Sequence, residues 1–318
     1  MNRLSLRTAC AALLLVLAPL ARAIIFYSTG DSSFNTTAPT GDLAGSGWQY
    51  LGNWNGFVGT QISPNQFITA NHVGGTVGGT FLGSDGNSYT TIGVARTNDL
   101  AIWTVSGTLP TYAPVYSGSS ELSLDMTVFG RGVGRGAELR APSATDADDL
   151  RGWLWGGTSA LRWGTNRFDL AESGFVNGGT SIGSILAADF TRGGGANEAT
   201  VGSGDSGGAT FVRVGGQWQL AGIVYGVQSA VRTTPSGSTV NAAIFDFGGL
   251  YSTSGSLLVA DQPTDVASLF IVSRLGADDN QAWLLSQVPE PAAYASVGLG
   301  AAALAVMAVR RRRSRRSV

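Results

Sequence analysis

The stretch "ANEATVGSGDSGGATFVRV" (residues 196–214) decides how the rest of the chain is interpreted. Its centre, "GDSGG", places Ser206 among glycines in a chain that has 46 glycines in 318 residues. Such a segment is either an ordinary flexible turn or a loop that exposes one reactive serine. The second interpretation makes further demands, because a nucleophilic serine needs a base, a group that orients the base, and donors for the developing oxyanion.

The chain offers a single residue as the base. His72 is the only histidine in the protein, and it lies in "QFITANHVGG" (66–75), where a strand-like run ends and glycines begin. A lone histidine is more often a surface or packing residue than a catalyst, but this chain also carries a candidate nucleophile. Asp99 precedes the apolar run "LAIWTV", so it either starts a strand at the surface or is a buried carboxylate that orients the imidazole. The sequence leaves both interpretations of Asp99 open.

The order of these residues along the chain excludes other classes of hydrolase. "GDSGG" also fits the looser G-x-S-x-G elbow of α/β-hydrolases, but those require a histidine after the serine, and none follows Ser206. The subtilisin order needs an aspartate before the histidine, which Asp31 or Asp42 would supply, but that fold requires alternating strands and long helices. The remaining order is His72, Asp99, Ser206.

The hydrophobic runs are short, rich in β-branched and aromatic residues, and separated by Gly, Asn, Ser and Pro. This pattern is typical of antiparallel sheets and barrels, so we expect an all-β protein. The run "DDNQAWLLSQ" near the C-terminus predicts a short helix capped by Asp278. The expected strands are residues 56–62, 66–70, 88–95, 99–105, 125–130, 184–190, 209–214 and 217–225.

Three segments resemble the chymotrypsin-like serine peptidases. "TANHV" around His72 is similar to that family's "TAAHC", "NDLAI" around Asp99 to its "NDIAL", and "GDSGG" to its nucleophile loop. The resemblance implies that Ser206 attacks a carbonyl, His72 moves the proton to the leaving group, and Asp99 holds His72. It further implies that the backbone N–H groups of Gly204 and Ser206 form the oxyanion hole.

The resemblance also implies the architecture. We expect two antiparallel β-barrels, at residues 24–125 and 126–287, with the site in the cleft between them. In that family the residue six positions before the serine floors the specificity pocket, which here is Thr200, and Gly226 lines its wall. Because no acid stands at the floor, we expect preference for a small or medium uncharged side chain and not for Arg or Lys.

Asp205 has a role of its own in that family, in which it pairs with a freshly cut N-terminal amine. Cleavage after Ala23 would expose Ile24 and Ile25, which resemble the family's "IV" start, although Phe26 follows where the family has glycine. We therefore expect that export itself activates the enzyme. The alternative is that Asp205 pairs internally with an arginine.

The N-terminus has the pattern of a secretory signal peptide. Arg3 and Arg7 precede an apolar run at residues 11–21, and "ARA" ends at Ala23. We therefore expect signal peptidase to remove residues 1–23. The only cysteine, Cys10, lies inside this segment, so the mature protein is expected to have no disulfide.

The C-terminal segment, residues 288–318, reads "VPEPAAYASVGLGAAALAVMAVRRRRSRRSV". The uncharged residues 292–309 would extend about 27 Å as a helix, enough to cross a bilayer, with the arginines on the cytoplasmic side. The segment resembles the PEP-CTERM sorting signal, which implies cleavage by an exosortase, a transient inner-membrane anchor and the envelope of a Gram-negative-type bacterium. The alternative is a permanent single-span anchor.

Composition constrains the possible partners. Without the two terminal segments the chain keeps 11 arginines and 20 acids, and this excess of negative charge argues against nucleic acid as a partner. No cofactor or metal is expected. Two further groups have two interpretations each: Asp146, Asp148 and Asp149 as a calcium site or a solvated loop, and Trp153, Trp155 and Trp163 as a ligand platform or barrel packing.

These observations predict an exported serine endopeptidase that acts on protein or peptide substrates through an acyl-enzyme. Two alternatives remain: a catalytically silent peptidase fold that serves as a surface binding or adhesion protein, and a non-catalytic β-sandwich module. The β-sandwich would not need the only histidine at position 72.

Overall fold

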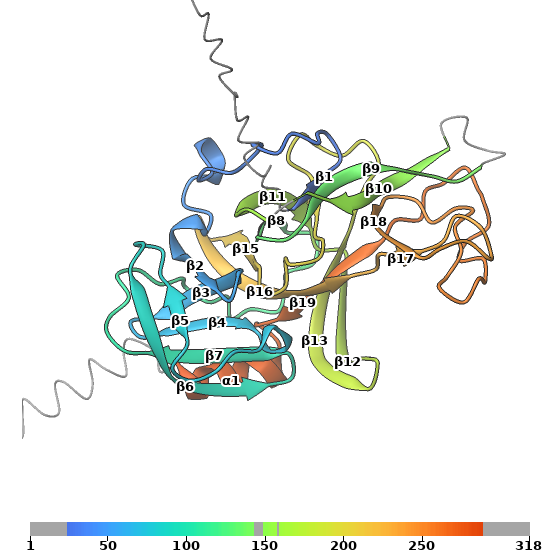
Figure 1. The fold of residues 1–318 in the computed structure, drawn as a ribbon. Coiled ribbons are helices and arrows are strands. Elements are labelled where there is room, and N and C mark those ends of the chain that lie inside the picture. The colour runs from blue at the N-terminus through green and yellow to red at the C-terminus, as the bar shows by residue number, and fades with distance from the viewer. Residues whose placement is uncertain (1–23, 143–148, 158, 289–318) are drawn as a thin grey trace, which may run out of the picture.

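The computed structural model describes residues 24–142, 149–157 and 159–288 (Figure 1). The predicted signal peptide, the predicted membrane helix at 292–309, Asp146 and Asp148 lie outside these residues. Within the described segments, no helix is both long and apolar enough to cross a membrane.

The first half of the chain forms a closed barrel in the strand order β2-β3-β4-β7-β6-β5. Aromatic rings fill its interior, where Phe67 stacks on Phe81 with ring centroids 3.9 Å apart. Gly52 is required beside them, because a Cβ there would lie 2.2 Å from the Phe81 ring. The strands are β2 (Leu51–Trp54), β3 (Phe57–Ser63), β4 (Gln66–Ala70), β5 (Thr80–Leu82), β6 (Ser88–Thr97) and β7 (Leu100–Val105).

The second half is built on a seven-stranded antiparallel sheet in the order β11-β8-β15-β16-β19-β13-β12. The closed second barrel that the resemblance implied is not formed by strand pairing in the described residues. At the β11 edge the side-chain amide of Asn166 donates to the carbonyls of Asp189 and Ala199, at 2.6 and 3.0 Å. The strands are β8 (Asp125–Gly130), β11 (Arg162–Arg167), β12 (Leu170–Asn177), β13 (Thr180–Asp189), β15 (Ala209–Val214), β16 (Gln217–Val227) and β19 (Leu269–Arg274).

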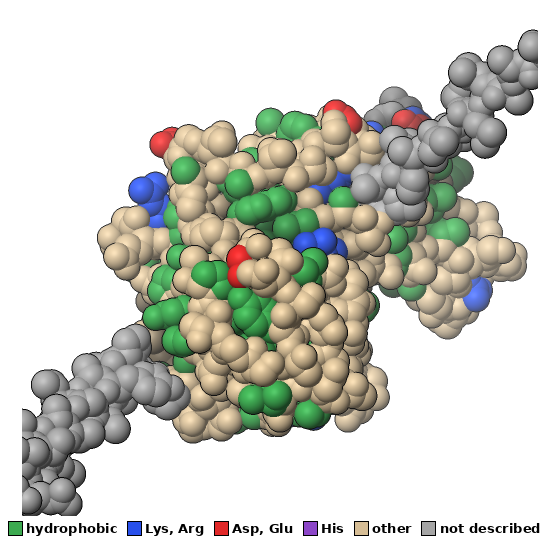
Figure 2. Space-filling view, turned by 60° about the vertical axis from the view of Figure 1, so that its left-hand side comes forward, with side chains coloured by type: hydrophobic (Ala, Val, Ile, Leu, Met, Phe, Trp, Pro, Cys, Tyr) green, Lys and Arg blue, Asp and Glu red, His purple; other side chains and the backbone are tan. Residues whose placement is uncertain are grey.

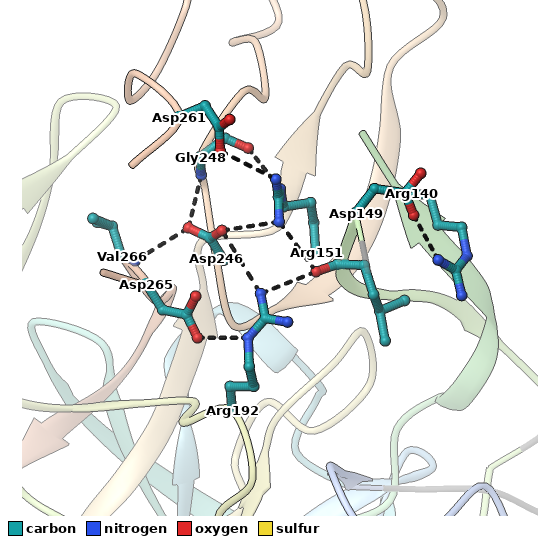
Figure 3. Close-up of polar contacts among 10 residues, drawn as sticks. Arg140, Asp149, Arg151, Arg192, Asp246, Gly248, Asp261, Asp265 and Val266 are labelled. Carbon is teal, nitrogen blue, oxygen red and sulfur yellow. Dashed lines mark hydrogen bonds and ion pairs between the residues drawn. The ribbon is translucent and has the colours of Figure 1, made fainter. Parts of the chain in front are cut away.

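A separate four-stranded sheet in the order β17-β18-β10-β9 projects from this half, at the right of Figure 1. Its strands come from two distant segments: β9 (Gly134–Arg140), β10 (Leu150–Gly156), β17 (Ala230–Val231) and β18 (Val240–Ile244). The buried Arg151 of β10 fixes the loop after β18, since it donates to the Gly248 carbonyl at 2.8 Å and pairs with Asp246 and Asp261 at 3.3 Å (Figure 3). Arg192 joins this network through Asp246 at 3.9 Å and also pairs with Asp265 at 2.7 Å (Figure 3).

Both ends of the described chain cross between the halves. β1 (Ile25–Phe26) pairs with β14 (Ala199–Thr200) of the second half. The helix α1 (Asp278–Gln287) returns to the first half and buries Leu284 in the core between the barrel and the sheet. On the face in Figure 2, charged side chains are few and hydrophobic ones gather near the middle.

All eight expected strands are present, three of them with the expected bounds. The helix is also present, but its N-cap is Ala277, which makes no side-chain capping bond, so the capping role expected of Asp278 is wrong. Trp153 and Trp163 are buried in the packing of the second half, and Arg135 lies over the Trp153 ring at 3.7 Å, which favours the packing interpretation of these tryptophans.

Candidate active site

The barrel brings His72 and Asp99 together through the pairing of two strands. His72 lies in the 3-10 turn η3 (Asn71–Val73) that follows β4, and Asp99 lies in the turn that precedes β7. Because Ala70 of β4 pairs with Leu100 of β7, the residues just beyond these strand ends are neighbours. The Asn71 backbone N–H donates to the Asp99 carbonyl at 2.8 Å and ties the two turns together.

The Asp99 carboxylate contacts both the backbone N–H and the imidazole ring of His72. Its Oδ1 accepts the His72 backbone N–H at 3.0 Å, and its Oδ2 lies 2.8 Å from Nδ1. The Asp99 side chain is 4% exposed, whereas that of His72 is 41% exposed. Asp99 is therefore a buried carboxylate that orients the ring, and the interpretation of a surface residue at the start of a strand is wrong.

Ser206 comes from the second half and meets the other side of the imidazole. Its Oγ lies 2.7 Å from His72 Nε2. Because Nδ1 faces the Asp99 carboxylate, the imidazole proton belongs on Nδ1, which leaves the Nε2 lone pair free to accept the Ser206 hydroxyl proton. The three residues thus form one hydrogen-bonded chain with the geometry that general-base activation of a hydroxyl requires.

Asn98 is a residue of this site that the sequence did not single out. It has a φ of 46°, a left-handed conformation that asparagine adopts more readily than most residues. Its side chain donates to Asn280 of α1 at 3.1 Å and accepts from Ser181 of β13 at 3.1 Å. These bonds fix the turn that carries Asp99 to both neighbouring elements.

The loop around Ser206 is held in shape by close backbone contacts. Gly204 has a φ of 90°, and a Cβ on it would lie 2.9 Å from the Cα of Gly132. Gly207 has a φ of 75° and donates its N–H to the Val224 carbonyl at 2.9 Å. In the part of the chain that the structure describes, neither the Gly204 nor the Ser206 backbone N–H donates a hydrogen bond. Both groups are therefore available to an incoming oxygen.

Asp205 is fully buried directly beneath this loop. Its Oδ2 accepts the Gly202 backbone N–H at 2.8 Å and its Oδ1 accepts that of Gly132 at 2.7 Å. Burial raises the pKa of Asp205 to about 7, against the opposing effects of the backbone N–H groups of Gly202, Gly132 and Ile24 and of the charge of Arg162. Both expected partners of Asp205, Ile24 and an arginine, therefore lie close enough to lower its pKa.

The two residues expected in the specificity pocket lie in different environments. Thr200 is buried in β14, where it pairs with Ile25, and its hydroxyl has no partner among the described residues. Gly226 lies in β16 next to open space, since a Cβ there would meet no atom within 4 Å. The adjacent Tyr225 packs its ring against that of His72 at 5.5 Å, a contact that the sequence analysis missed.

The three aspartates considered as a calcium site form no cation site in the described residues. Asp149 pairs with the Arg140 guanidinium at 2.5 Å. Its two expected companions, Asp146 and Asp148, lie outside the described residues.

One comparison with known families bears on the C-terminus. Residues 287–313 match the PEP-CTERM protein-sorting motif, which confirms the predicted sorting signal. This signal indicates export and sorting to the cell envelope of Gram-negative-type bacteria. No curated protein is significantly similar to this chain in sequence.

Several solved structures of proteases have a distantly similar arrangement. One is the Rv3671c protease in an inactive form, with 15% identity, a TM-score of 0.41 and coverage of 80% of this chain and 99% of that chain. A mutant of Rv3671c from M. tuberculosis H37Rv has 16% identity, a TM-score of 0.44 and coverage of 80% and 98%. An inactive mutant of the murine norovirus NS6 protease has 18% identity, a TM-score of 0.35 and coverage of 63% and 94%.

Proposed function

We propose that this protein is an exported serine endopeptidase. The observation that carries the proposal is the hydrogen-bonded chain from Asp99 through His72 to Ser206, with distances of 2.8 and 2.7 Å. A buried carboxylate, an oriented imidazole and an accessible hydroxyl are the parts that nucleophilic acyl transfer needs. The sorting signal at residues 287–313 supports the export of this enzyme from the cytoplasm.

Each group has a defined role in the reaction. Ser206 Oγ forms a bond to the carbonyl carbon of a peptide while His72 Nε2 takes the hydroxyl proton, and Asp99 stabilises the imidazolium. The carbonyl oxygen becomes an anion that the backbone N–H groups of Gly204 and Ser206 bind, a stabilisation of about 3 kcal/mol per donor. The C–N bond then breaks as His72 protonates the leaving amine. Water, activated by His72, hydrolyses the acyl-enzyme.

Removal of residues 1–23 by signal peptidase is the activating step of the proposal. Ile24 is buried beside Asp205 and has a φ of 50°, which a β-branched residue rarely adopts. A chain that begins at Ile24 has no φ at this residue, so cleavage after Ala23 removes the constraint. It also converts an amide N–H into an ammonium group, a stronger partner for the buried Asp205 carboxylate.

The finer assignments follow from the same site. Thr200 at the pocket floor and Gly226 at its wall favour a small or medium uncharged side chain in the substrate.

After export, an exosortase is the partner that cleaves the C-terminal tail, which anchors the protein transiently in the inner membrane through residues 292–309.

A fluorophosphonate probe tests the proposal on the processed chain. We expect labelling of the wild type and of Ser203→Ala, a matched control in an exposed position of the same loop, and none of Ser206→Ala. A folded wild type with a free Ile24 amine that takes no label would overturn the proposal and leave the silent binding protein in its place. Full activity of Ile24→Gly would refute the activation step alone.

A further inference from the structure

Arg131 is an arginine without a protein partner. Every other arginine in residues 24–142, 149–157 and 159–288 donates a hydrogen bond, forms an ion pair or lies over an aromatic ring. For Arg131 no such contact exists among these residues. Its Nε is buried with nothing to bond, while its terminal nitrogens reach solvent.

The surroundings of Arg131 leave its charge uncompensated. Burial lowers the pKa of this guanidinium, and no acidic side chain opposes the effect. For comparison, the pKa of the half-buried Arg135 is also lowered by burial, but Glu138 acts against it. A partly buried cation with unused donors is unfavourable in the free protein and gains most when an anion arrives.

Arg131 lies next to the oxyanion loop. Its two neighbours wrap around Asp205, since a Cβ on Gly130 would lie 2.0 Å from Asp205 Oδ1 and a Cβ on Gly132 would lie 2.6 Å from the Asp205 backbone nitrogen. Gly132 also contacts Gly204, the first expected oxyanion donor. Burial alone lowers the pKa of Arg131, so the guanidinium gains no compensation from the nearby Asp205 carboxylate.

Arg131 directly follows β8, and β8 borders the junction between the barrel and the sheet. Phe129, two residues earlier, packs its ring against Trp48 at 6.4 Å and against Phe211 at 5.9 Å in the core between the two halves. His72 and Ser206 meet across the same junction. A substrate bound at Ser206 would lie on the loop that Gly132 contacts at Gly204, one residue along the chain from Arg131.

We propose that Arg131 binds a substrate carboxylate and makes this enzyme selective for peptides with an acidic group close to the scissile bond. The inference rests on the proposed peptidase function. Two terminal N–H groups of a guanidinium match the two oxygens of a carboxylate, and such charge-assisted bonds are short and strong. The carboxylate has two sources, an Asp or Glu side chain or the C-terminus of the substrate.

Cleavage of a mixed peptide library by the processed full chain tests this inference. We expect cleaved bonds to be enriched in Asp and Glu at one position within about three residues, or to lie near peptide C-termini, and matched Glu and Gln peptides to differ about ten-fold in kcat/KM. Amidation of the C-termini distinguishes the sources, because it abolishes the preference only if the terminal carboxylate is recognised.

Variants complete the test. Arg131→Gln should remove the difference between Glu and Gln peptides, Arg131→Lys should keep part of it, and Arg213→Gln, at an exposed position of β15, should leave it unchanged. A wild type that cleaves without acidic preference, or an Arg131→Gln variant that keeps it, would overturn this inference but not the peptidase function. A folded processed chain that takes no fluorophosphonate label would overturn both.

Discussion

The carboxylate of Asp99 is the most informative group to change, because its two oxygens hold His72 in different ways. Oδ1 accepts the His72 backbone N–H at 3.0 Å and also lies 3.0 Å from Nδ1, whereas Oδ2 is the oxygen nearer to Nδ1, at 2.8 Å. In Asp99→Asn the side-chain oxygen keeps the backbone hydrogen bond, and the amide nitrogen takes the place of Oδ2. Two donors cannot face each other, so Nδ1 becomes an acceptor and the imidazole proton moves to Nε2.

In that tautomer His72 can no longer act as the base. Nε2 lies 2.7 Å from Ser206 Oγ, and once protonated it has no lone pair to accept the hydroxyl proton. The imidazolium of the transition state also loses its buried counter-charge. We expect kcat to fall about 10⁴-fold, which is about 5.4 kcal/mol of transition-state stabilisation, with KM little changed.

The assay is steady-state hydrolysis of one peptide from the library, with thermal unfolding as the check on the fold. Asp125→Asn is the matched control, because Asp125 is an exposed carboxylate that pairs with the exposed Arg167. It should keep its kcat. The reasoning is refuted if folded Asp99→Asn keeps more than about a tenth of the wild-type kcat, or if the control loses as much.

Three further predictions concern the loop, the N-terminus and the buried ion pairs. Gly204→Ala should lower the rate of fluorophosphonate labelling by about 10²-fold or more, because a Cβ displaces the oxyanion loop. In a chain that retains residues before Ile24, the Asp205 pKa of about 7 lies above the value of an unfolded aspartate, so stability should fall as pH rises from about 4 to about 7. The loss should be on the order of 4 kcal/mol in urea unfolding, and a processed chain with its ammonium group should lack most of it. Arg151→Met should cost about 3 to 5 kcal/mol of unfolding free energy, against less than about 1 kcal/mol for the exposed Arg167→Met.

Each of these predictions has an outcome that contradicts it. Labelling of Gly204→Ala at the wild-type rate would show that the loop tolerates a side chain. If the stability of the processed and unprocessed chains depends on pH to the same extent, the N-terminal ammonium group does not interact with Asp205. Equal losses of unfolding free energy in Arg151→Met and Arg167→Met would mean that the burial of the Arg151 ion pairs does not affect stability.

The alternation of short apolar runs was enough to predict eight of the strands, because each strand places its own side chains alternately inside and outside. Other strands, among them β2, β5, β9 to β12, and β17 to β19, were not expected, and β10 pairs with β18 across almost a hundred residues. The second closed barrel was expected from resemblance alone. The described residues form an open sheet there, and Asn166 bonds from its edge to Asp189 and Ala199 of other segments, which no local pattern reveals.

The sequence by itself determined which groups could do the chemistry: one histidine, one serine in a glycine loop, and an order along the chain that excluded two other hydrolase classes. Only the tertiary structure decided that Asp99 is buried, that Ile24 lies beside Asp205, and that no acidic side chain among the described residues pairs with Arg131. The physical reason is that burial, and the pKa values and hydrogen bonds that follow from it, depend on which distant segments pack together. The identity of a residue is local, but the dielectric and the partners around it are not.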